Sequence, residues 1–246
     1  MIKFCVCIKQ VPDVSAPVHT GRMVLNAYDA SAVEEALVLT ERYGGEIDLV
    51  LIGPASAAET IRKALAMGAD RATHLVIGDD ERPDSMAVAK MLADYLANKD
   101  YDVIATGKQA QDTDAGLTGS MLAERLGLPY ASNAVGLAYE AETRQLVVTR
   151  QGDAGQEIIA LPMPCLVTCS NDMNDPRIPT LKGIMGAKRK PIDTREVAVP
   201  AEGLPVTKVL AFEPVPEREP GQRLEGEPEE VARLLCKKLA EEARVL

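Results

Sequence analysis

Residues 47–77, Ile-Asp-Leu-Val-Leu-Ile-Gly-Pro-Ala-Ser-Ala-Ala-Glu-Thr-Ile-Arg-Lys-Ala-Leu-Ala-Met-Gly-Ala-Asp-Arg-Ala-Thr-His-Leu-Val-Ile, decide the fold. The apolar run 47–52 predicts a buried strand, residues 57–67 predict a helix that ends at Gly68, and residues 73–77 predict a second strand. Strands that alternate with helices in this way are typical of a parallel sheet covered by helices.

The same rhythm continues on both sides of this stretch. Residues 2–8 and 102–106 predict strands, and helices are expected at 85–97 and from about Gly116 to Leu126, closed by Gly127. Ser31 and Glu34 form a capping-box pattern that predicts the start of another helix. The runs 135–139, 146–149, 157–161 and 165–169 resemble antiparallel strands added to the sheet. We therefore predict an α/β fold: a three-layer, doubly wound, mostly parallel sheet with added antiparallel strands.

The last part of the chain differs in composition. Residues 191–228 contain seven of the sixteen prolines and too few apolar residues for a core of their own. This composition predicts an extended arm. Residues 229–244 predict a short amphipathic helix with Val231, Leu234, Leu235 and Leu239 on one stripe. We expect an α/β domain at 1–194, which contains the candidate sites below, and an arm with its helix at 195–246. The arm must pack on this domain or on another chain.

Composition restricts the partners. The net charge of -10 opposes binding to nucleic acid. The longest apolar runs are strand-sized and no cleavable leader opens the chain, so we expect no membrane insertion and a cytoplasmic location. The five cysteines lack a Cys-x-x-Cys spacing and only two histidines are present, so neither a metal site nor a disulfide framework is predicted. Cys5 and Cys7 are expected to be buried on one face of a strand.

A loop that follows a strand and leads into a helix is the first candidate site. Residues 107–119, Gly-Lys-Gln-Ala-Gln-Asp-Thr-Asp-Ala-Gly-Leu-Thr-Gly, contain small residues that permit backbone approach to a phosphate at the helix N-terminus. Asp112 and Asp114 would repel a phosphate, so we expect them to cap the helix or to meet a ribose hydroxyl. The loop lacks the known phosphate-loop motifs, and a simple capped turn is the alternative. Residues 26–29 and 52–54 are further candidates, although alone they indicate only a helix N-cap and a turn.

A second candidate is the stretch 171–192, which includes Pro176 and Pro179 and ends in a basic run. The prolines stiffen the backbone, and Leu181, Ile184 and Met185 show neither helical nor strand periodicity. These apolar residues either tuck into the core or contact another protein. We find no catalytic constellation, because His19 and His74 are far apart and acidic pairs such as Glu34-Glu35 suit solvated helix faces.

Six segments resemble, in order, the β subunit of electron transfer flavoproteins. They are Val6-Cys-Ile-Lys9; Asn26 followed by Ala32-Val-Glu-Glu-Ala36; Glu59-Thr-Ile-Arg-Lys-Ala-Leu-Ala-Met-Gly-Ala-Asp70; Gly107-Lys-Gln-Ala110; Asn174-Asp-Pro-Arg177; and Thr180-Leu181 with Ile184-Met185, Ala187-Lys188 and Lys190. The resemblance covers residues 1 to about 192. It implies a heterodimer in which an α subunit holds most of the FAD site and the β subunit buries AMP. In electron-bifurcating members a second FAD replaces the AMP.

The resemblance also implies roles for individual residues. The cofactor-binding positions are Cys7, Asn26, Ala27, Tyr28, Asp29, Ile52, Gly107, Lys108, Gln109, Ala110, Gln111, Asp112, Thr113, Asp114, Ala115, Gly116, Leu117 and Thr118. The partner-recognition positions are Leu181 as the anchor, with Ile184, Met185 and Arg177. The chain departs from the pattern at 115–117, where relatives often place a Gln before Thr118, so AMP and a second FAD both stay open.

We predict an electron-carrier subunit rather than a stand-alone enzyme, since the flavin holds the electrons and the protein sets distance, potential and partner. The implied donors are flavin dehydrogenases of the acyl-CoA dehydrogenase type, as in fatty acid oxidation, and an implied acceptor is a membrane quinone oxidoreductase. The alternatives are an electron-bifurcating flavoprotein, a stand-alone nucleotide-hydrolysing or nucleotide-sensing α/β enzyme, and a purely structural assembly subunit.

Overall fold

The computed structural model describes residues 1–13, 21–200 and 220–245, together with 207, 210, 211, 213 and 216. The chain divides into two compact units, Met1–Lys208 and Val209–Leu246. The first unit contains the sheet and both candidate sites.

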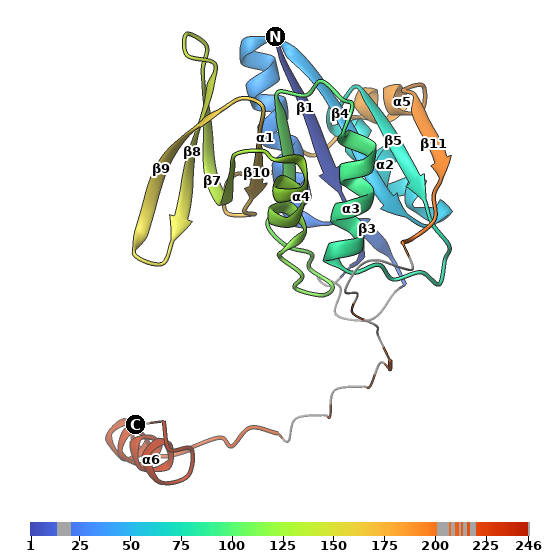
Figure 1. Ribbon diagram of the computed structural model, residues 1–246. Coiled ribbons are helices and arrows are strands. Elements are labelled where there is room, and N and C mark those ends of the chain that lie inside the picture. The colour runs from blue at the N-terminus through green and yellow to red at the C-terminus, as the bar shows by residue number, and fades with distance from the viewer. Residues whose placement is uncertain are drawn as a thin grey trace. The chain divides into compact units, whose positions relative to one another are not determined.

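A nine-stranded sheet forms the centre of the first unit, in the order β11-β5-β4-β1-β6-β10-β7-β8-β9 (Figure 1). Its strands are β1 (Ile2–Ile8), β4 (Gly45–Gly53), β5 (Arg71–Val76), β6 (Val103–Gly107), β7 (Tyr130–Glu140), β8 (Gln145–Gly152), β9 (Gly155–Pro162), β10 (Cys165–Cys169) and β11 (Ile192–Glu196). All neighbours from β11 to β7 are parallel, whereas β7, β8 and β9 form an antiparallel meander. A separate antiparallel pair joins β2 (Gln10–Pro12) to β3 (Met23–Leu25).

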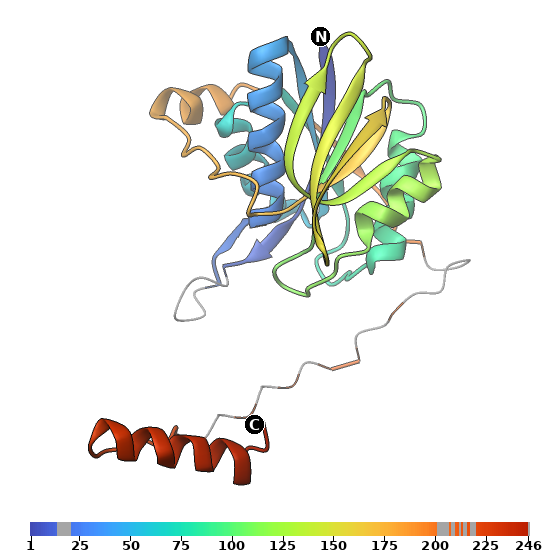
Figure 2. The same cartoon turned by 90° about the vertical axis from the view of Figure 1, so that its left-hand side faces the viewer.

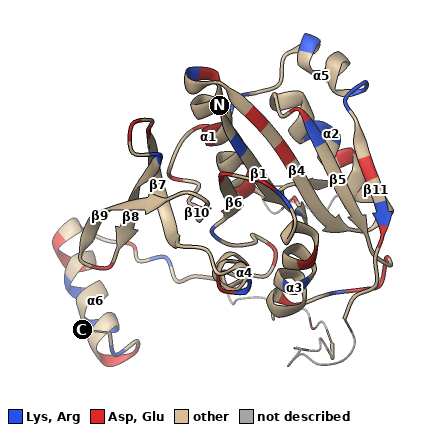
Figure 3. Ribbon diagram, turned by 45° about the horizontal axis from the view of Figure 1, so that its top comes forward, with Lys and Arg blue, Asp and Glu red and all other residues tan. Residues whose placement is uncertain are grey.

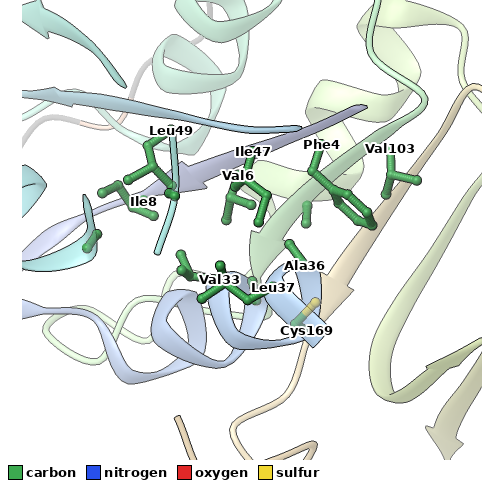
Figure 4. Packing of buried hydrophobic residues seen from close by; sticks show 14 of the residues in the cluster. Phe4, Val6, Ile8, Val33, Ala36, Leu37, Ile47, Leu49, Val103 and Cys169 are labelled. Carbon is green, nitrogen blue, oxygen red and sulfur yellow. The ribbon is translucent and has the colours of Figure 1, made fainter. Parts of the chain in front are cut away.

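Helices cover both faces of the sheet. The helices are α1 (Ala27–Tyr43), α2 (Ala58–Met67), α3 (Ser85–Leu96), α4 (Thr118–Leu126) and α5 (Leu181–Ala187), with a 3₁₀ turn at Ala55–Ala57. Phe4, Val6 and Ile8 of β1 share one core cluster with α1 and α2, as Figure 4 shows for α1. Cys5 and Cys7 point to the opposite face and share a second cluster with α3 and α4. Apolar side chains on both faces are typical of a buried parallel strand, so the predicted three-layer fold is confirmed.

The strand order places a topological switch point beside β1. The chain passes from β1 to β4 and β5 on one side and then returns to β6 on the other side of β1. In open parallel sheets, ligands bind at such a switch point, outside the carboxyl ends of the two strands. The loop 107–117 and the start of α1 meet there.

Two details of the predicted fold are wrong. β10 was expected among the antiparallel strands, but it is parallel to β6 and β7 and all five of its residues are buried, as befits an apolar strand inside the sheet. The capping-box pattern also misplaces a helix start, because α1 begins at Ala27 and both Ser31 and Glu34 lie buried inside it. At the actual start of α1, the Gln111 side-chain oxygen accepts a hydrogen bond from the N–H of Ala27.

Among the elements that the sequence did not predict are α5 and β11. Residues 181–187 form α5, and the Thr180 hydroxyl caps it by accepting a hydrogen bond from the N–H of Gly183 at 3.1 Å. Residues 192–196, in the stretch assigned to the arm, form β11 and pair with β5 at the edge of the sheet. Both elements are short and mostly exposed, so they carry little hydrophobic periodicity.

The second unit contains the predicted C-terminal helix, α6 (Pro228–Glu241). Its boundaries follow its sequence: Pro228 opens it, Glu229 and Glu230 lie in the first turn, and Lys238 lies in the last. Figure 3 shows residues of both charges along it. None of its described residues is buried, and Leu234 and Leu235 are 41% and 46% exposed. Among the described residues, no helix is long and apolar enough to span a bilayer.

Candidate functional site

Asp29 joins the two strand ends at the switch point. Its carboxylate is buried, and its two oxygens accept hydrogen bonds from the backbone N–H of Lys9, just after β1, at 2.7 Å and of Gly107, at the end of β6, at 2.9 Å. Asp29 lies in the first turn of α1, so one carboxylate fixes a helix N-terminus against two strands. This arrangement joins the start of α1 to the carboxyl ends of β1 and β6.

Gly107 is required by this contact. A Cβ atom at Gly107 would lie 2.2 Å from Asp29 Oδ1 and 2.7 Å from the Tyr28 Cβ atom. Backbone and side chain can approach this closely only because position 107 lacks a side chain. The loop after β6 is thereby held directly against the start of α1.

Asn26 fastens the next part of the loop. Its side-chain amide donates to the carbonyl of Gln109 at 2.9 Å, and its side-chain oxygen accepts from the N–H of Gln111 at 3.1 Å. The Asn26 side chain makes no capping hydrogen bond to α1. Its role is therefore to shape the loop, which differs from the simple N-cap that the residue suggests when it is considered alone.

The acidic residues of the loop are occupied by neighbours. The Lys9 ammonium binds both carboxylate oxygens of Asp112, at 2.7 and 2.8 Å, and Asp114 accepts from the Gln109 side chain at 3.2 Å. Neither aspartate caps α4, because Leu117 precedes this helix and no side chain caps its N-terminus. The capping alternative is therefore wrong, and a contact with a ribose hydroxyl stays a prediction. Lys9 offsets the charge of Asp112, which reduces the expected repulsion of a phosphate near the loop.

Burial dominates the electrostatics of Asp29. Removal of the carboxylate from water raises its pKa to about 7, although hydrogen bonds from Asn26, Lys9 and Gly107 favour the charged form. The Cys5 thiol nearby is also perturbed. A hydrogen bond with Cys7, followed by burial, raises the pKa of Cys5. The Cys5 thiol is therefore held in the protonated, unreactive form.

The structure brings together most of the predicted cofactor positions. The stretches Asn26 to Asp29 and Gly107 to Gln111 are joined by the hydrogen bonds above, and Thr118 begins α4. The stretch from Asp112 to Leu117, which includes Thr113, Ala115 and Gly116, is exposed. Cys7 is buried and Ile52 partly buried in the cluster beneath α3 and α4, near the carboxyl ends of β1 and β4.

The partner-recognition positions lie elsewhere. α5 packs against α2, and Figure 1 shows it near the end of the molecule where β1 begins, far from the loop before α4. Leu181, Met185 and Ile184 are 75%, 62% and 47% exposed. This exposure excludes the alternative in which Leu181 tucks into the core. Figure 3 shows basic residues in α5 and in the connection to β11.

Lys9, Glu34 and Glu41 make important contacts but were not predicted as site residues from the sequence. Lys9 is the first charged residue after β1, and that position alone is a signal for a switch-point residue. Glu34 was assigned to a solvated helix face, but it is buried and binds Arg177 at 2.8 Å. Glu41, seven residues later and so on the same face of α1, binds Arg177 too.

His74 is buried on β5, and His19 lies outside the described residues. No group of three metal-ligating side chains occurs among the residues that the structure describes.

Comparison with known proteins gives a consistent result. The family model described as "Electron transfer flavoprotein domain" matches residues 17–200. "Electron transfer flavoprotein subunit beta" of Bacillus subtilis is 35% identical over 228 residues, covering 91% of this chain and 88% of that protein. The protein of the same name from Bradyrhizobium diazoefficiens is 38% identical over 259 residues, covering 100% of both chains. "Caffeyl-CoA reductase-Etf complex subunit CarD" of Acetobacterium woodii is 37% identical over 203 residues, covering 78% of this chain and 77% of that protein.

Proposed function

Because this chain belongs to the family of electron transfer flavoprotein β subunits, we propose that it is the β subunit of a heterodimer whose α subunit holds the electron-carrying FAD. The heterodimer accepts electrons from flavin dehydrogenases of the acyl-CoA dehydrogenase type and passes them to a downstream acceptor such as a membrane quinone oxidoreductase. The FAD supplies the redox chemistry, and this chain contributes binding and position. The proposed location is the cytoplasm.

The observation that carries the proposal is the switch-point site between β1 and β6. Here Asp29 and Asn26 hold the loop that leads into α4, and the N-terminus of α4 lacks a side-chain cap. Uncapped N–H groups at a helix N-terminus favour a phosphate. The ion pair of Asp112 with Lys9 and the exposed position of Gly116, whose Cβ atom would lie 3.4 Å from the Lys108 carbonyl oxygen, also suit a nucleotide.

We assign AMP to this site as a structural ligand. This chain has no Trp and only 3% aromatic residues. Backbone groups and aliphatic side chains must therefore hold the adenine ring. Asn26 to Asp29 and Gly107 to Thr118 are the residues proposed to form the site, with Cys7 and Ile52 beneath them. Because the ligand is structural, none of these residues needs to act in proton or electron transfer.

The alternative function is that of an electron-bifurcating flavoprotein with a second FAD at the same site. The similarity to a subunit of a caffeyl-CoA reductase-Etf complex is the reason to keep this alternative function. The stretch from Asp112 to Leu117 is exposed, so the outer side of the site borders solvent. We expect a larger dinucleotide to contact the same inner residues as AMP.

The proposal is tested by joining this chain to an α subunit. The two subunits are co-expressed, and the reduction of the bound flavin is followed by absorbance after an acyl-CoA dehydrogenase and its substrate are added. We expect a stable heterodimer whose flavin is reduced only when the dehydrogenase and substrate are both present. The α subunit without this chain provides the control.

Two results would overturn the proposal. One is failure of this chain to associate with an α subunit. The other is hydrolysis of a nucleotide by the isolated chain at rates typical of enzymes, which would favour the stand-alone α/β enzyme.

A further inference from the structure

Arg177 lies just before α5 and is fully engaged with α1. Its Nε donates to Glu34 Oε2 at 2.8 Å, its Nη2 donates to Glu34 Oε1 at 3.0 Å and to Glu41 Oε2 at 3.1 Å, and its Nη1 donates to Glu41 Oε1. Its backbone N–H also donates to Glu34 Oε2 at 3.0 Å. We name Arg177, Glu34 and Glu41 the α1 clamp. Forked pairing of this kind fixes orientation as well as distance.

A neighbouring contact extends the attachment along α1. The Asn174 side-chain amide donates to the carbonyl of Ser31 at 3.2 Å and to Glu35 Oε2 at 3.0 Å. Figure 2 shows the connection from β10 to α5 running beside α1. The chain is thus attached to α1 at two positions before it reaches α5.

The other end of α5 is attached to α2. The Lys190 ammonium donates to the carbonyls of Leu65, Gly68 and Ala69, which terminate α2. Arg62 of α2 donates back to the carbonyls of Ala187 and Lys190, both at 2.6 Å. Cations at a helix C-terminus satisfy its last carbonyls and favour its dipole.

These attachments determine which face of α5 is exposed. Gly183 lies against α2, where a Cβ atom would come within 2.6 Å of the Ala66 carbonyl oxygen, and Ala187, one turn later, is buried. Leu181 and Met185, also one turn apart, are 75% and 62% exposed. A rotation of α5 that buried Leu181 would require both ends of the helix to detach.

We propose that Arg177 is a positioning residue for docking: through the α1 clamp it holds α5 so that Leu181 and Met185 face a dehydrogenase. This inference rests on the proposed function of α5 as the docking element. It differs from the expectation that Arg177 itself contacts the partner. All three guanidinium nitrogens already donate to Glu34 or Glu41, and the Glu34 side chain is only 10% exposed.

Electrostatics supports the clamp. Hydrogen bonds with Glu41 and then with Glu34 raise the pKa of Arg177, so the guanidinium stays charged across the working pH range. A partner that recruited Arg177 would leave Glu34 buried without its counter-charge, which is costly. A fixed Arg177 also lowers the entropy that docking would otherwise lose by ordering the segment.

The test is a double-mutant cycle on the assembled heterodimer. Arg177→Lys keeps the charge but removes the fork, and Leu181→Ala removes the proposed anchor. The KM for an acyl-CoA dehydrogenase and the kcat are measured for each single variant and for the double variant. Arg189→Lys makes the same exchange in the same segment, at a side chain for which the described structure shows no ion pair, and serves as the control. Glu41→Gln weakens the clamp at its more exposed member if Arg177→Lys proves unstable.

A positioning role predicts a KM increase on the order of tenfold in Arg177→Lys with kcat unchanged, and little further increase when Leu181 is already Ala. Reduction of the flavin by dithionite should be unaffected. Independent, multiplying effects of the two substitutions would show that Arg177 contacts the partner itself and would overturn the inference. An unchanged KM in both Arg177→Lys and Glu41→Gln would also overturn it, whereas an unchanged KM in Leu181→Ala would refute the docking role of α5.

Discussion

Two opposing effects, burial and hydrogen bonding, act on the Asp29 side chain of the switch-point site. Three hydrogen-bond donors, from Asn26, Lys9 and Gly107, favour its ionised form, but burial opposes ionisation more strongly and raises its pKa to about 7. A buried carboxylate of this kind costs stability when it is charged. Asp29 nevertheless joins two strand ends through its hydrogen bonds and so shapes the loop that we propose to bind the nucleotide.

This conflict predicts a specific pH dependence. The folded-state pKa of about 7 lies above the ordinary 3.8, so the folded state keeps a proton that the unfolded state releases as pH rises. The contribution of Asp29 to stability is therefore complete below about pH 4 and is lost by about pH 7, an effect on the order of a few kcal/mol. Asp29→Asn removes the titration, although its amide group leaves one backbone N–H without an acceptor.

Urea unfolding of the wild type and of Asp29→Asn at pH 5 and pH 8 measures this effect. We expect the wild type to hold a clear advantage at pH 5 and to lose most of it at pH 8. An equal difference in the free energy of unfolding at both pH values would mean that Asp29 is ionised throughout.

At Leu181, the same scale gives a prediction about docking. Burial of an exposed leucine in a partner contributes roughly 1.5–3 kcal/mol, so Leu181→Ala should weaken coupling to a dehydrogenase by about one to two orders of magnitude. The melting temperature and flavin content should hardly change, because the side chain is 75% exposed. Ile158→Ala on β9, which removes an equally exposed side chain at 75%, is the matched control. A large loss of stability with normal coupling would contradict the docking role.

At the scale of elements, the hydrophobic pattern predicted the positions of those strands and helices that are stabilised by burial of apolar side chains. The strands β1, β4, β5 and β6 and the helices α2, α3 and α4 follow their apolar periodicity, so their positions were predictable. α5 and β11 were not, because polar contacts hold them: Thr180 caps α5, Lys190 fixes its end, and β11 pairs with β5 through backbone hydrogen bonds. The same reason hid Lys9 and Glu34, whose importance depends on partners 103 and 143 residues away.

The packing of α5 on α2 gives a prediction with a built-in control. Gly183→Ala should displace α5, because the new Cβ atom would lie 2.6 Å from the Ala66 carbonyl oxygen, at a cost of about 1–3 kcal/mol. Gly186→Ala in the same helix meets nothing within 4 Å and should be neutral or stabilise by up to about 1 kcal/mol.

Thermal unfolding and dehydrogenase-dependent flavin reduction distinguish the two variants. Only Gly183→Ala should lose coupling. Equal behaviour of the two variants would show that close contact with α2 does not set the orientation of α5.

At the scale of the whole molecule, the main question is which surface the helix of the second unit packs on. None of the described residues of α6 is buried, although Val231, Leu234, Leu235 and Leu239 form an apolar stripe. A short amphipathic helix gains most of its stability from the surface it packs on. Arg195 and Glu196 pair with β5 in this chain's own sheet, so the predicted arm begins after β11 rather than at residue 195. We propose that the rest of the arm and its helix, up to residue 246, dock on the α subunit.

Limited proteolysis tests this proposal. The isolated chain should be cut between β11 and α6, or should aggregate, whereas the heterodimer should be protected over the same residues. A monodisperse isolated chain with a protease-resistant C-terminal segment would contradict an obligate partnership.

The central claim is that the switch-point site of this β subunit holds AMP while the α subunit holds FAD. The most direct measurement is chromatographic identification of the nucleotides released when the purified two-subunit complex is denatured. We predict one FAD and one AMP per heterodimer. Gly116→Leu, at an exposed position where a Cβ atom comes no closer than 3.4 Å to other atoms, should lose the AMP and keep the FAD and the fold. Release of two FAD molecules, or of FAD without AMP, from the wild-type complex would contradict the claim, and stoichiometric AMP in Gly116→Leu would show that the loop has been misassigned.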